Sequence, residues 1–482
     1  MLHGRQIASW ILMPTAFLFL SGFLFFNEKE LPKTDDDWLK ETLEARKVVS
    51  DSLSDAIRNN HRVGSSKFSP GDENKSIQLN VKYTIDPELQ NKADVLLRQY
   101  KPDYGAIFMF DAKTGKVLAM SSWEKANPKA DNLNLRATFP AASVFKVITA
   151  SAAVDKAGVS PEHKIGYNGG NYTLYKRNVM SDKVNRWTRF ITLREAFARS
   201  INTAFGRLSL ESLEPKDLSE YAKRFMFNQP IPTDFQVEIS QARVPDQKGF
   251  ELTEVASGFN RFNTLSPVHG AMIAGTIIND GKMVVPYTID SLTDENSEIK
   301  YKAQVLERGQ ILRPESAAMV REMMEQTVLS GTSRKSFRSL VRSKKFREID
   351  MGGKTGHFTG TNPKGKTDWF VGYASDGEDK IAIAAITVNI KKWTVKSSAL
   401  AEMMFRKYFQ DRFEEKDQAD VKPAGKVKNQ SKHFKTSQKK MARHKFSPSK
   451  KIAKIKIKSI KKNQKIAKHK LIRKNKIKVA RN

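Results

Sequence analysis

Three short polar motifs occur in order along this chain: Ser143-Val-Phe-Lys146, Ser200-Ile-Asn202 and Lys354-Thr355-Gly356. Their first residues are separated by 57 and then 154 positions. A serine becomes a nucleophile when a neighbouring base takes its proton, and a lysine can be that base only in its neutral form. The three motifs therefore contain the residue types needed for acyl transfer through a covalent serine intermediate.

The segment around Ser143 has the signals of a helix start. Pro140 precedes the serine, and an apolar stretch follows it and ends near Gly158. Residues three positions apart lie on one face of a helix, which brings Lys146 to Ser143. We expect a neutral Lys146 to take the serine proton, while the helix N-terminus favours the developing negative charge. The alternative is that Ser143 is a cap residue and Lys146 a surface lysine.

Ser-x-x-Lys also occurs elsewhere in the chain, at Ser122, Ser297, Ser437, Ser447 and Ser459. None of these serines begins an apolar helix: Ser122 follows a strand edge, Ser297 lies in a polar stretch, and the other three lie in the C-terminal tail. A second Lys-Thr-Gly, at 113–115, has the composition of a hairpin turn. Context therefore selects Ser143 and the motif that begins at Lys354.

The Ser200-Ile-Asn202 motif lies between two helical pieces. We expect the Ser200 hydroxyl to relay a proton between Lys146 and a leaving amine. The Asn202 amide is expected to hydrogen-bond the backbone of a peptide substrate. Taken alone, the motif has the composition of an ordinary helix cap.

The Lys-Thr-Gly motif precedes two apolar runs, 368–373 and 381–388, which are typical of buried strands. It should therefore occupy an edge strand of their sheet, where its glycines let a substrate backbone approach. We expect Lys354 to supply positive charge for a terminal carboxylate and to lower the pKa of Lys146 by like-charge proximity. Thr355 would offer its hydroxyl to the same carboxylate.

Composition and pattern divide the chain into five segments. These are an N-terminus (1–6), an anchor (7–26), a stalk or linker (27–80), a globular domain (81–412) and a Lys-rich low-complexity tail (413–482). The stalk is polar, with one amphipathic helix between Trp38 and Ile57. The domain opens with a helix after Asp86-Pro87 and two strands, and it ends with a helix from Ala399 to about Phe409.

Residues 7–26 carry no charged side chain, and about 20 apolar residues suffice to cross a bilayer as a helix. We interpret them as an uncleaved single-pass anchor. The alternative is a cleaved signal peptide, but no small-x-small cleavage site follows the apolar run. Arg5 and the terminal amine precede the run, so the positive-inside rule places residues 1–6 in the cytoplasm and the rest of the chain outside.

The chain has 482 residues and a formal net charge of +32. Residues 421–482 hold 24 Lys and Arg without an acidic residue, which leaves +8 for residues 1–420. Such a tail is too polar to bury a core, so it is predicted to be disordered. By charge it can bind anionic polymers or lipids, and an external tail would meet envelope polymers or lipid headgroups. The alternative is a solvated tail without a partner.

Two kinds of chemistry are excluded or disfavoured by composition. The chain contains no cysteine, which excludes disulfides, thiolate zinc sites and thiol nucleophiles. No His-Glu-x-x-His pair or similar spacing is present, so we expect no metal and no cofactor. No nucleic-acid-binding motif accompanies the basic tail, and specific nucleic-acid binding is not expected.

With these motifs in view, the chain resembles the transpeptidase domain of penicillin-binding proteins, within the superfamily that includes the serine β-lactamases. The resemblance extends to YTIDPELQ at Tyr83, GAIFMFDAKTGKVLAM at Gly105, LSPVHGAMIAGTIINDGKMVVP at Leu265 and DWFVGYA at Asp368, and it covers residues 81–412. It implies an α+β fold: a five-stranded antiparallel sheet flanked by helices, with a cleft between the sheet edge and a helical lobe.

The resemblance also implies roles for the motif residues. Ser143 corresponds to the acylated nucleophile, Lys146 to its base, Ser200 to the proton relay and Asn202 to a substrate contact. The substrate-binding strand corresponds to Lys354, Thr355, Gly356 and His357. Backbone N–H groups of Ser143 and His357 would form the oxyanion hole. The family most often has Thr or Ser where this chain has His357, so carboxylate recognition is expected to differ there.

The implied function is a peptidoglycan D,D-transpeptidase of the bacterial cytoplasmic membrane that β-lactams inhibit covalently. Ser143 would acylate on the D-Ala-D-Ala end of a stem peptide, and a neighbouring stem amine would resolve the acyl-enzyme. Hydrolysis by water, as in a D,D-carboxypeptidase or a β-lactamase, is one alternative, and a non-catalytic penicillin-binding sensor is another. Stem peptides, β-lactams, the membrane and a glycan-polymerising synthase are the implied partners.

Overall fold

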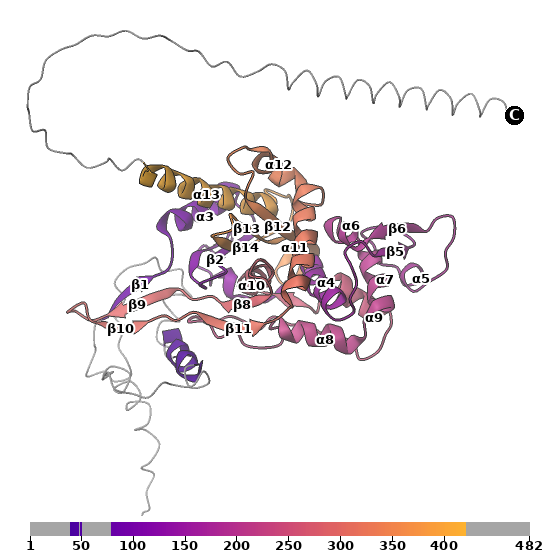
Figure 1. Ribbon diagram of the computed structural model, residues 1–482, viewed down its shortest axis with the longest axis horizontal. Coiled ribbons are helices and arrows are strands. Elements are labelled where there is room, and N and C mark those ends of the chain that lie inside the picture. Colours follow the sequence, from indigo (N-terminus) through magenta and orange to yellow (C-terminus); the bar gives the residue numbers. More distant parts are fainter. Residues whose placement is uncertain (1–38, 48, 51–78, 421–482) are drawn as a thin grey trace, which may run out of the picture. The chain divides into compact units, whose positions relative to one another are not determined.

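The computed structural model describes residues 39–47, 49–50 and 79–420 of the chain (Figure 1). The predicted anchor at 7–26, most of the predicted stalk and residues 421–482 lie outside this part. Among the helices of the described part, none is long and apolar enough to cross a membrane. The anchor therefore stays a prediction from the sequence.

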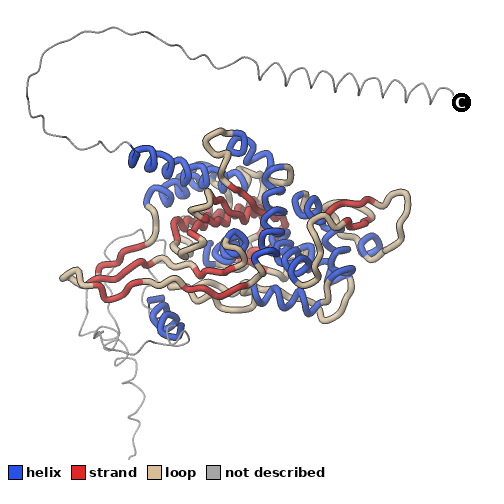
Figure 2. The backbone as a smooth tube through the Cα atoms, viewed as in Figure 1, coloured by secondary structure: helices blue, strands red, loops and turns tan. Residues whose placement is uncertain are grey.

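The centre of the domain is a five-stranded sheet with the order β12-β13-β14-β2-β3, in which every neighbouring pair is antiparallel. In Figure 2, strands (red) lie in the middle of the domain with helices (blue) around them. Its strands are β2 (Tyr104–Asp111), β3 (Val117–Glu124), β12 (Asp350–Thr361), β13 (Lys364–Ser375) and β14 (Lys380–Asn389). The predicted five-stranded antiparallel sheet is confirmed. As predicted, the Lys354 motif lies on an edge strand, β12, and β3 forms the other edge.

Helices cover both faces of the sheet because its apolar side chains alternate between the two faces. On one face, Ile107, Phe370 and Ile383 pack with α3 (Pro87–Tyr100), α12 (Arg334–Arg342) and α13 (Ser397–Asp420). On the other face, Phe108, Val371 and Ala384 belong to a larger core that includes α10 (Pro267–Ile278). The predicted cap of α3 is present, since the Asp86 carboxylate accepts hydrogen bonds from the backbone of Glu88 and Leu89.

A helical lobe lies beside the β12 edge, at the right of Figure 1. It contains α4 (Lys146–Asp155), α5 (Lys176–Val179), α6 (Leu193–Ala198), α7 (Asn202–Ser212), α8 (Pro215–Arg224), α9 (Phe250–Ser257) and a hairpin of β5 (Lys164–Tyr167) and β6 (Arg189–Thr192). The long helix α11 (Pro314–Leu329) packs against both β12 and the lobe. The sheet edge and the lobe thus meet along β12.

Several elements were not predicted from the sequence. Strands β1 (Asn80–Tyr83), β9 (Ile289–Thr293) and β10 (Ile299–Lys302) form a three-stranded sheet, and β8 (Lys282–Val285) pairs with β11 (Leu306–Gln310). Helix α13 continues to Asp420, beyond the predicted end near Phe409 and into the first residues of the predicted tail. The Phe413 ring lies 5.6 Å from Phe346, so tertiary packing supports this extension.

Part of the predicted stalk packs against the domain. Residues 39–47 and 49–50 are helical, within the amphipathic helix predicted between Trp38 and Ile57. From this N-terminal helical segment Arg46 is only 1% exposed. Its guanidinium donates hydrogen bonds to the carbonyls of Gln304 (2.8 Å) and Pro232 (3.3 Å) and lies over the Tyr287 ring. A buried cation with these partners fixes the segment to the domain.

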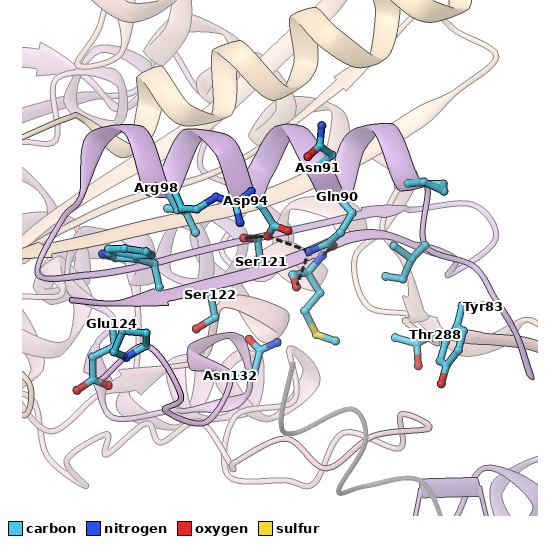
Figure 3. Close-up of a pocket in the computed structure, with 16 residues that line it drawn as sticks. Tyr83, Gln90, Asn91, Asp94, Arg98, Ser121, Ser122, Glu124, Asn132 and Thr288 are labelled. Atoms are coloured by element: carbon cyan, nitrogen blue, oxygen red, sulfur yellow. Dashed lines mark hydrogen bonds between the residues drawn. The ribbon is translucent and has the colours of Figure 1, made fainter. Parts of the chain in front are cut away.

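A cavity of about 730 Å³ lies between α3 and β3 (Figure 3). Its polar lining includes Gln90, whose amide donates to the Met120 carbonyl (3.3 Å) and accepts from the Met120 N–H (2.8 Å). Asp94 accepts a hydrogen bond of 2.6 Å from Ser121. Gln90 thus covers part of the outer edge of β3, which would otherwise be open to pairing. The cavity is at the opposite edge of the sheet from the Lys354 motif.

Candidate active site

Ser143 lies in a short 3₁₀ turn, η2 (Ala142–Phe145), directly before α4. The sequence analysis used Pro140, near the first turn, as a signal of the helix start. Pro140 belongs instead to the two-residue strand β4 (Phe139–Pro140), which pairs with β7 (Thr264–Leu265). Ala142 has a φ of 48°, an uncommon conformation for a residue with a side chain. The chain therefore makes a sharp turn that presents the half-buried Ser143 at the start of α4.

Lys146 is fully buried beneath this serine. Its Nζ lies 2.9 Å from Ser143 Oγ and 2.7 Å from Asn202 Oδ1, and it also contacts the Ser257 carbonyl. Burial, and then the charge of Lys354, hold the Lys146 pKa well below its usual range. A neutral amine can donate to the two carbonyl oxygens and accept the Ser143 O–H on its lone pair. This arrangement suits a general base.

Lys354 is also fully buried and lies on the other side of the site. Its Nζ donates hydrogen bonds to Ser200 Oγ (2.8 Å) and to the Thr355 carbonyl (2.9 Å). Burial lowers the Lys354 pKa to about 7, because the ammonium loses its hydration. Ser200 has a φ of 56° between α6 and α7, so its hydroxyl projects from a tight turn. The structure brings the second and third motifs together through this contact.

The Asn202 amide is engaged on both sides. Its Oδ1 accepts the hydrogen bond from Lys146, and its Nδ2 donates to the Tyr172 carbonyl at 2.9 Å. The sequence suggested a contact with substrate, whereas in this structure the amide orients the lysine and holds the loop that contains Tyr172. Asn202 is thus well placed as a positioning residue for Lys146.

Thr355 has a partner that the sequence did not reveal. Its hydroxyl lies 2.6 Å from the hydroxyl of Thr332, which follows α11. Thr332 is exposed and its backbone N–H donates to the Ala198 carbonyl, at the end of α6. The pairing connects three separate segments, so no local signal in the sequence identifies it.

His357 is fixed beside the motif by three further residues. Its Nε2 lies 2.6 Å from Asp368 Oδ1, and its ring stacks on Trp393 with centroids 5.4 Å apart. Lys396 Nζ lies 3.4 Å from the same nitrogen. Asp368 is 2% exposed, and its other oxygen accepts the Ser397 N–H at 2.7 Å. The imidazole therefore has a defined position, although sequence analysis gave no indication of its partners.

Two glycines let backbone segments approach the nucleophile. Gly258, after α9, has a φ of 65°, and a Cβ there would lie 1.9 Å from the Ala142 carbonyl oxygen. Gly356 would place a Cβ 3.3 Å from the side chains of Ala142 and Val144. Gly258 was missed by the sequence analysis, although a glycine after a helix is the usual signal for its C-terminal end. No cluster of three or more His, Asp or Glu suited to a metal occurs in the described ranges.

The fold and the site together define a serine acyl-transfer enzyme of the penicillin-binding type. A family model, penicillin binding protein transpeptidase domain, matches residues 105–410. The chain belongs to this family, and the predicted family and class of enzyme are confirmed.

Curated relatives agree with this assignment. This chain is 27% identical over 348 positions to peptidoglycan D,D-transpeptidase PbpA of Mycolicibacterium smegmatis. The alignment covers 64% of this chain and 67% of the relative. It is 25% identical over 297 positions to stage V sporulation protein D of Bacillus subtilis. This second alignment covers 58% of the chain and 44% of the relative. The chain thus spans less than half of the second relative.

Solved structures also match. The penicillin G acyl-enzyme complex of penicillin-binding protein A from M. tuberculosis is 25% identical, with a TM-score of 0.56, over 70% of this chain and 81% of that one. Penicillin-binding protein 3 from the same organism, in its apo form, is 19% identical with a TM-score of 0.59, over 73% and 83%. At 19% identity, the likeness to penicillin-binding protein 3 shows only that the two chains share a fold.

Proposed function

We propose that this chain is a peptidoglycan D,D-transpeptidase that forms an acyl-enzyme on Ser143. The observation that carries the proposal is the contact of 2.9 Å between Ser143 Oγ and the buried Lys146 amine, whose pKa is lowered by burial and by Lys354. The names of the relatives support the substrate class: PbpA is a peptidoglycan D,D-transpeptidase, and penicillin-binding protein A forms an acyl-enzyme with penicillin G.

Acylation follows from the positions of these groups. Neutral Lys146 takes the Ser143 proton as Oγ attacks the carbonyl carbon between the two D-Ala residues of a stem peptide. Backbone N–H groups of Ser143 and His357 are proposed to stabilise the tetrahedral oxyanion, a contribution of about 3 kcal/mol per donor in comparable enzymes. The terminal D-Ala then leaves. Ser200 is proposed to relay the proton from Lys146 to the leaving amine of this D-Ala.

The terminal carboxylate of the donor stem is proposed to bind at the β12 edge. Lys354 provides the ammonium, Thr355 provides a hydroxyl held by Thr332, and His357 provides an imidazole held by Asp368. Gly356 lets β12 pass close to the turn that carries Ser143, because a Cβ there would lie 3.3 Å from the side chains of Ala142 and Val144. A charge-assisted hydrogen bond to the carboxylate orients the scissile bond toward Ser143.

The second half-reaction transfers the acyl group to the amine of a neighbouring stem. We propose this transfer over hydrolysis because PbpA of Mycolicibacterium smegmatis, which matches over 348 positions, is named a peptidoglycan D,D-transpeptidase. Product analysis distinguishes the two outcomes: cross-linked stems mean transfer to an amine, whereas free tetrapeptide stems mean transfer to water.

The setting of the enzyme is also proposed from the sequence. Residues 7–26 anchor the chain in the cytoplasmic membrane, with the catalytic domain on the outer side. The Lys-rich residues 421–482 bind anionic envelope polymers or lipids there, and a glycan-polymerising synthase is the proposed functional partner.

The direct test is mass spectrometry of the full-length protein after treatment with a fluorescent penicillin. One adduct is expected, on Ser143, and Ser143→Ala should abolish it. Ser122→Ala is the matched control, because this serine also has a lysine three positions later but lies on β3 at the far edge of the sheet. An adduct that maps to Ser122 or to Ser200 would overturn the assignment.

A further inference from the structure

One short segment of the helical lobe exposes an unusual number of large apolar side chains. Of the 15 that are prominently exposed in the described part of the chain, six lie within residues 172–190. They are Tyr172, Tyr175, Met180, Val184, Trp187 and Phe190, with exposed fractions from 40% to 72%. Exposed apolar side chains that gather in one segment, instead of being scattered singly, commonly mark an interaction site.

The same segment is strongly basic. It carries exposed cations at Lys176, Arg177, Lys183, Arg186 and Arg189, against a single acidic residue, Asp182. Two of the cations are paired with rings: the Arg186 guanidinium lies 4.7 Å from the Trp187 ring, and the Arg189 guanidinium lies 4.5 Å from the Tyr167 ring. We call residues 172–190 the aromatic-basic segment. Its charge favours an anionic partner.

Hydrogen bonds connect the start of this segment, and the residues just before it, to Asn202 and Thr203 at the start of α7. The Asn202 side chain donates to the Tyr172 carbonyl, and the Asn202 backbone N–H donates to the Asn171 carbonyl at 2.7 Å. The next residue, Thr203, donates its hydroxyl to the carbonyls of Gly170 (2.7 Å) and Thr173 (3.1 Å). The segment therefore begins directly beside the residue that holds Lys146.

The far part of the segment contacts residues 166–168, which precede the segment in the chain. The Asn168 side chain donates to the Lys183 carbonyl at 3.1 Å and accepts from the Thr188 hydroxyl at 2.8 Å. The Phe190 ring packs on Gly166, where an added Cβ would lie 3.1 Å from it. The exposed rings and cations are thus carried by the connection from β5 to β6 and by the first residues of β6 (Figure 1).

We propose that the aromatic-basic segment binds the peptidoglycan strand whose stem peptide occupies the active site. The proposal rests on the transpeptidase function above and adds a binding surface outside the catalytic residues. Sugar rings present flat C–H faces that pack on exposed aromatic rings, and the carboxylates of the stem peptides pair with Lys and Arg side chains. A polymer bound at Ser143 extends beyond the catalytic residues, and the segment starts beside Asn202.

A membrane surface is the competing partner, because aromatic and basic side chains also suit anionic lipid headgroups. The hydrogen bonds from Asn202 to the Tyr172 carbonyl and from Thr203 to the Thr173 carbonyl favour the substrate, since they join the segment to the site where the polymer reacts. The test below includes a lipid arm to separate the two.

The test uses the full-length protein, one polymeric substrate and one small acylating ligand. The variants Trp187→Ala and Arg186→Glu change one exposed ring and one exposed cation of the segment. Ile299→Ala and Lys344→Glu are the matched controls, because both residues are exposed and lie outside the lobe. Release of D-Ala is measured from polymeric peptidoglycan with pentapeptide stems, and the rate of acylation is measured with a fluorescent penicillin.

Each segment variant is expected to lower kcat/KM on the polymer about tenfold, mainly through KM, which corresponds to about 1.4 kcal/mol. Acylation by penicillin should stay within about twofold of the unaltered protein, since Arg186 and Trp187 lie in the far part of the segment and penicillin has no polymer chain to contact them. The control variants should leave both rates unchanged. Penicillin labelling of the unaltered protein without any D-Ala release would instead refute the transpeptidase function itself.

Three results would overturn the proposal. The first is an unchanged kcat/KM on the polymer for both segment variants. The second is an equal loss on polymer and penicillin, which would mean that the segment acts only by supporting Asn202. The third is weaker flotation of the variants with phosphatidylglycerol vesicles while turnover of the polymer is unchanged, which would assign the segment to the membrane.

Discussion

The pH dependence of acylation tests the roles of the two buried lysines. The Lys354 pKa is lowered to about 7 by burial, so its ammonium form, which we propose binds the carboxylate of the ligand, is lost as pH rises through this value. The Lys146 pKa is also lowered, so the neutral form that acts as base is lost as pH falls through its own value. The second-order rate constant for acylation by penicillin G should therefore be bell-shaped.

The size of the alkaline decline follows from the Lys354 value. With a pKa of about 7, about half of the Lys354 side chains are protonated at pH 7 and about one tenth at pH 8. Acylation should therefore fall about fivefold between these two pH values, and about tenfold for each further pH unit. A methyl ester of the same penicillin, which has no carboxylate, should show no such decline.

Two variants separate the contributions of the lysines. Lys354→Arg keeps a charge that is not lost in this pH range, so the alkaline decline should disappear while the acid limb from Lys146 remains. Lys354→Met removes the charge, so acylation should be slow throughout and the acid limb should move to higher pH, because a like charge no longer lowers the Lys146 pKa. Stopped-flow acylation from pH 5 to 10 provides the measurement. An alkaline decline that persists in Lys354→Arg would refute the assignment to Lys354.

Three further predictions concern the surroundings of the nucleophile. Lys146→Arg should abolish acylation by a fluorescent penicillin, since guanidinium keeps its proton, and near-normal labelling would remove the role as base. Gly258→Ala should lower both the melting temperature and penicillin labelling, because its Cβ would lie 1.9 Å from the Ala142 carbonyl oxygen. Gly249→Ala, at the other end of α9, is the control: its Cβ meets no atom within 4 Å, so the melting temperature and labelling should not change. Thr332→Val should slow acylation about fivefold by removing one hydrogen bond, while Thr332→Ser should retain the rate; equal rates for the two would contradict this role.

Local signals in the sequence located most of the elements that carry the catalytic residues. Asp86 caps α3 as predicted, and the Lys354 motif lies on an edge strand of the sheet that contains the two apolar strands that follow it. These signals succeed because caps and strand periodicity depend on neighbouring residues only. The contact between Lys146 and Ser143 was predictable for the same reason, as it joins residues three positions apart.

The proximity of Lys354 to Lys146 was predicted from the motifs, whereas long-range contacts with residues outside the three motifs were not. Ser257 reaches Lys146 from 111 residues away, and Thr332 pairs with Thr355 from the end of another helix. The strand β1 has only four residues, so its pattern of apolar and polar residues carried too little information to predict a strand. Its partner β9 lies about 200 residues later in the chain. Asn202 shows the limit of motif reasoning, because the motif located the residue but not the loop at Tyr172 that it holds.

The buried Arg46 sets how far the catalytic domain can reach from the bilayer. If residues 7–26 anchor the chain, a free linker from Phe26 to Leu79 would allow a tether of up to about 185 Å in extended form. Because the N-terminal helical segment is fixed to the domain through Arg46, only the residues between Phe26 and Leu39 remain as a tether, and these span at most about 45 Å. The catalytic domain would then act only within this distance of the membrane surface.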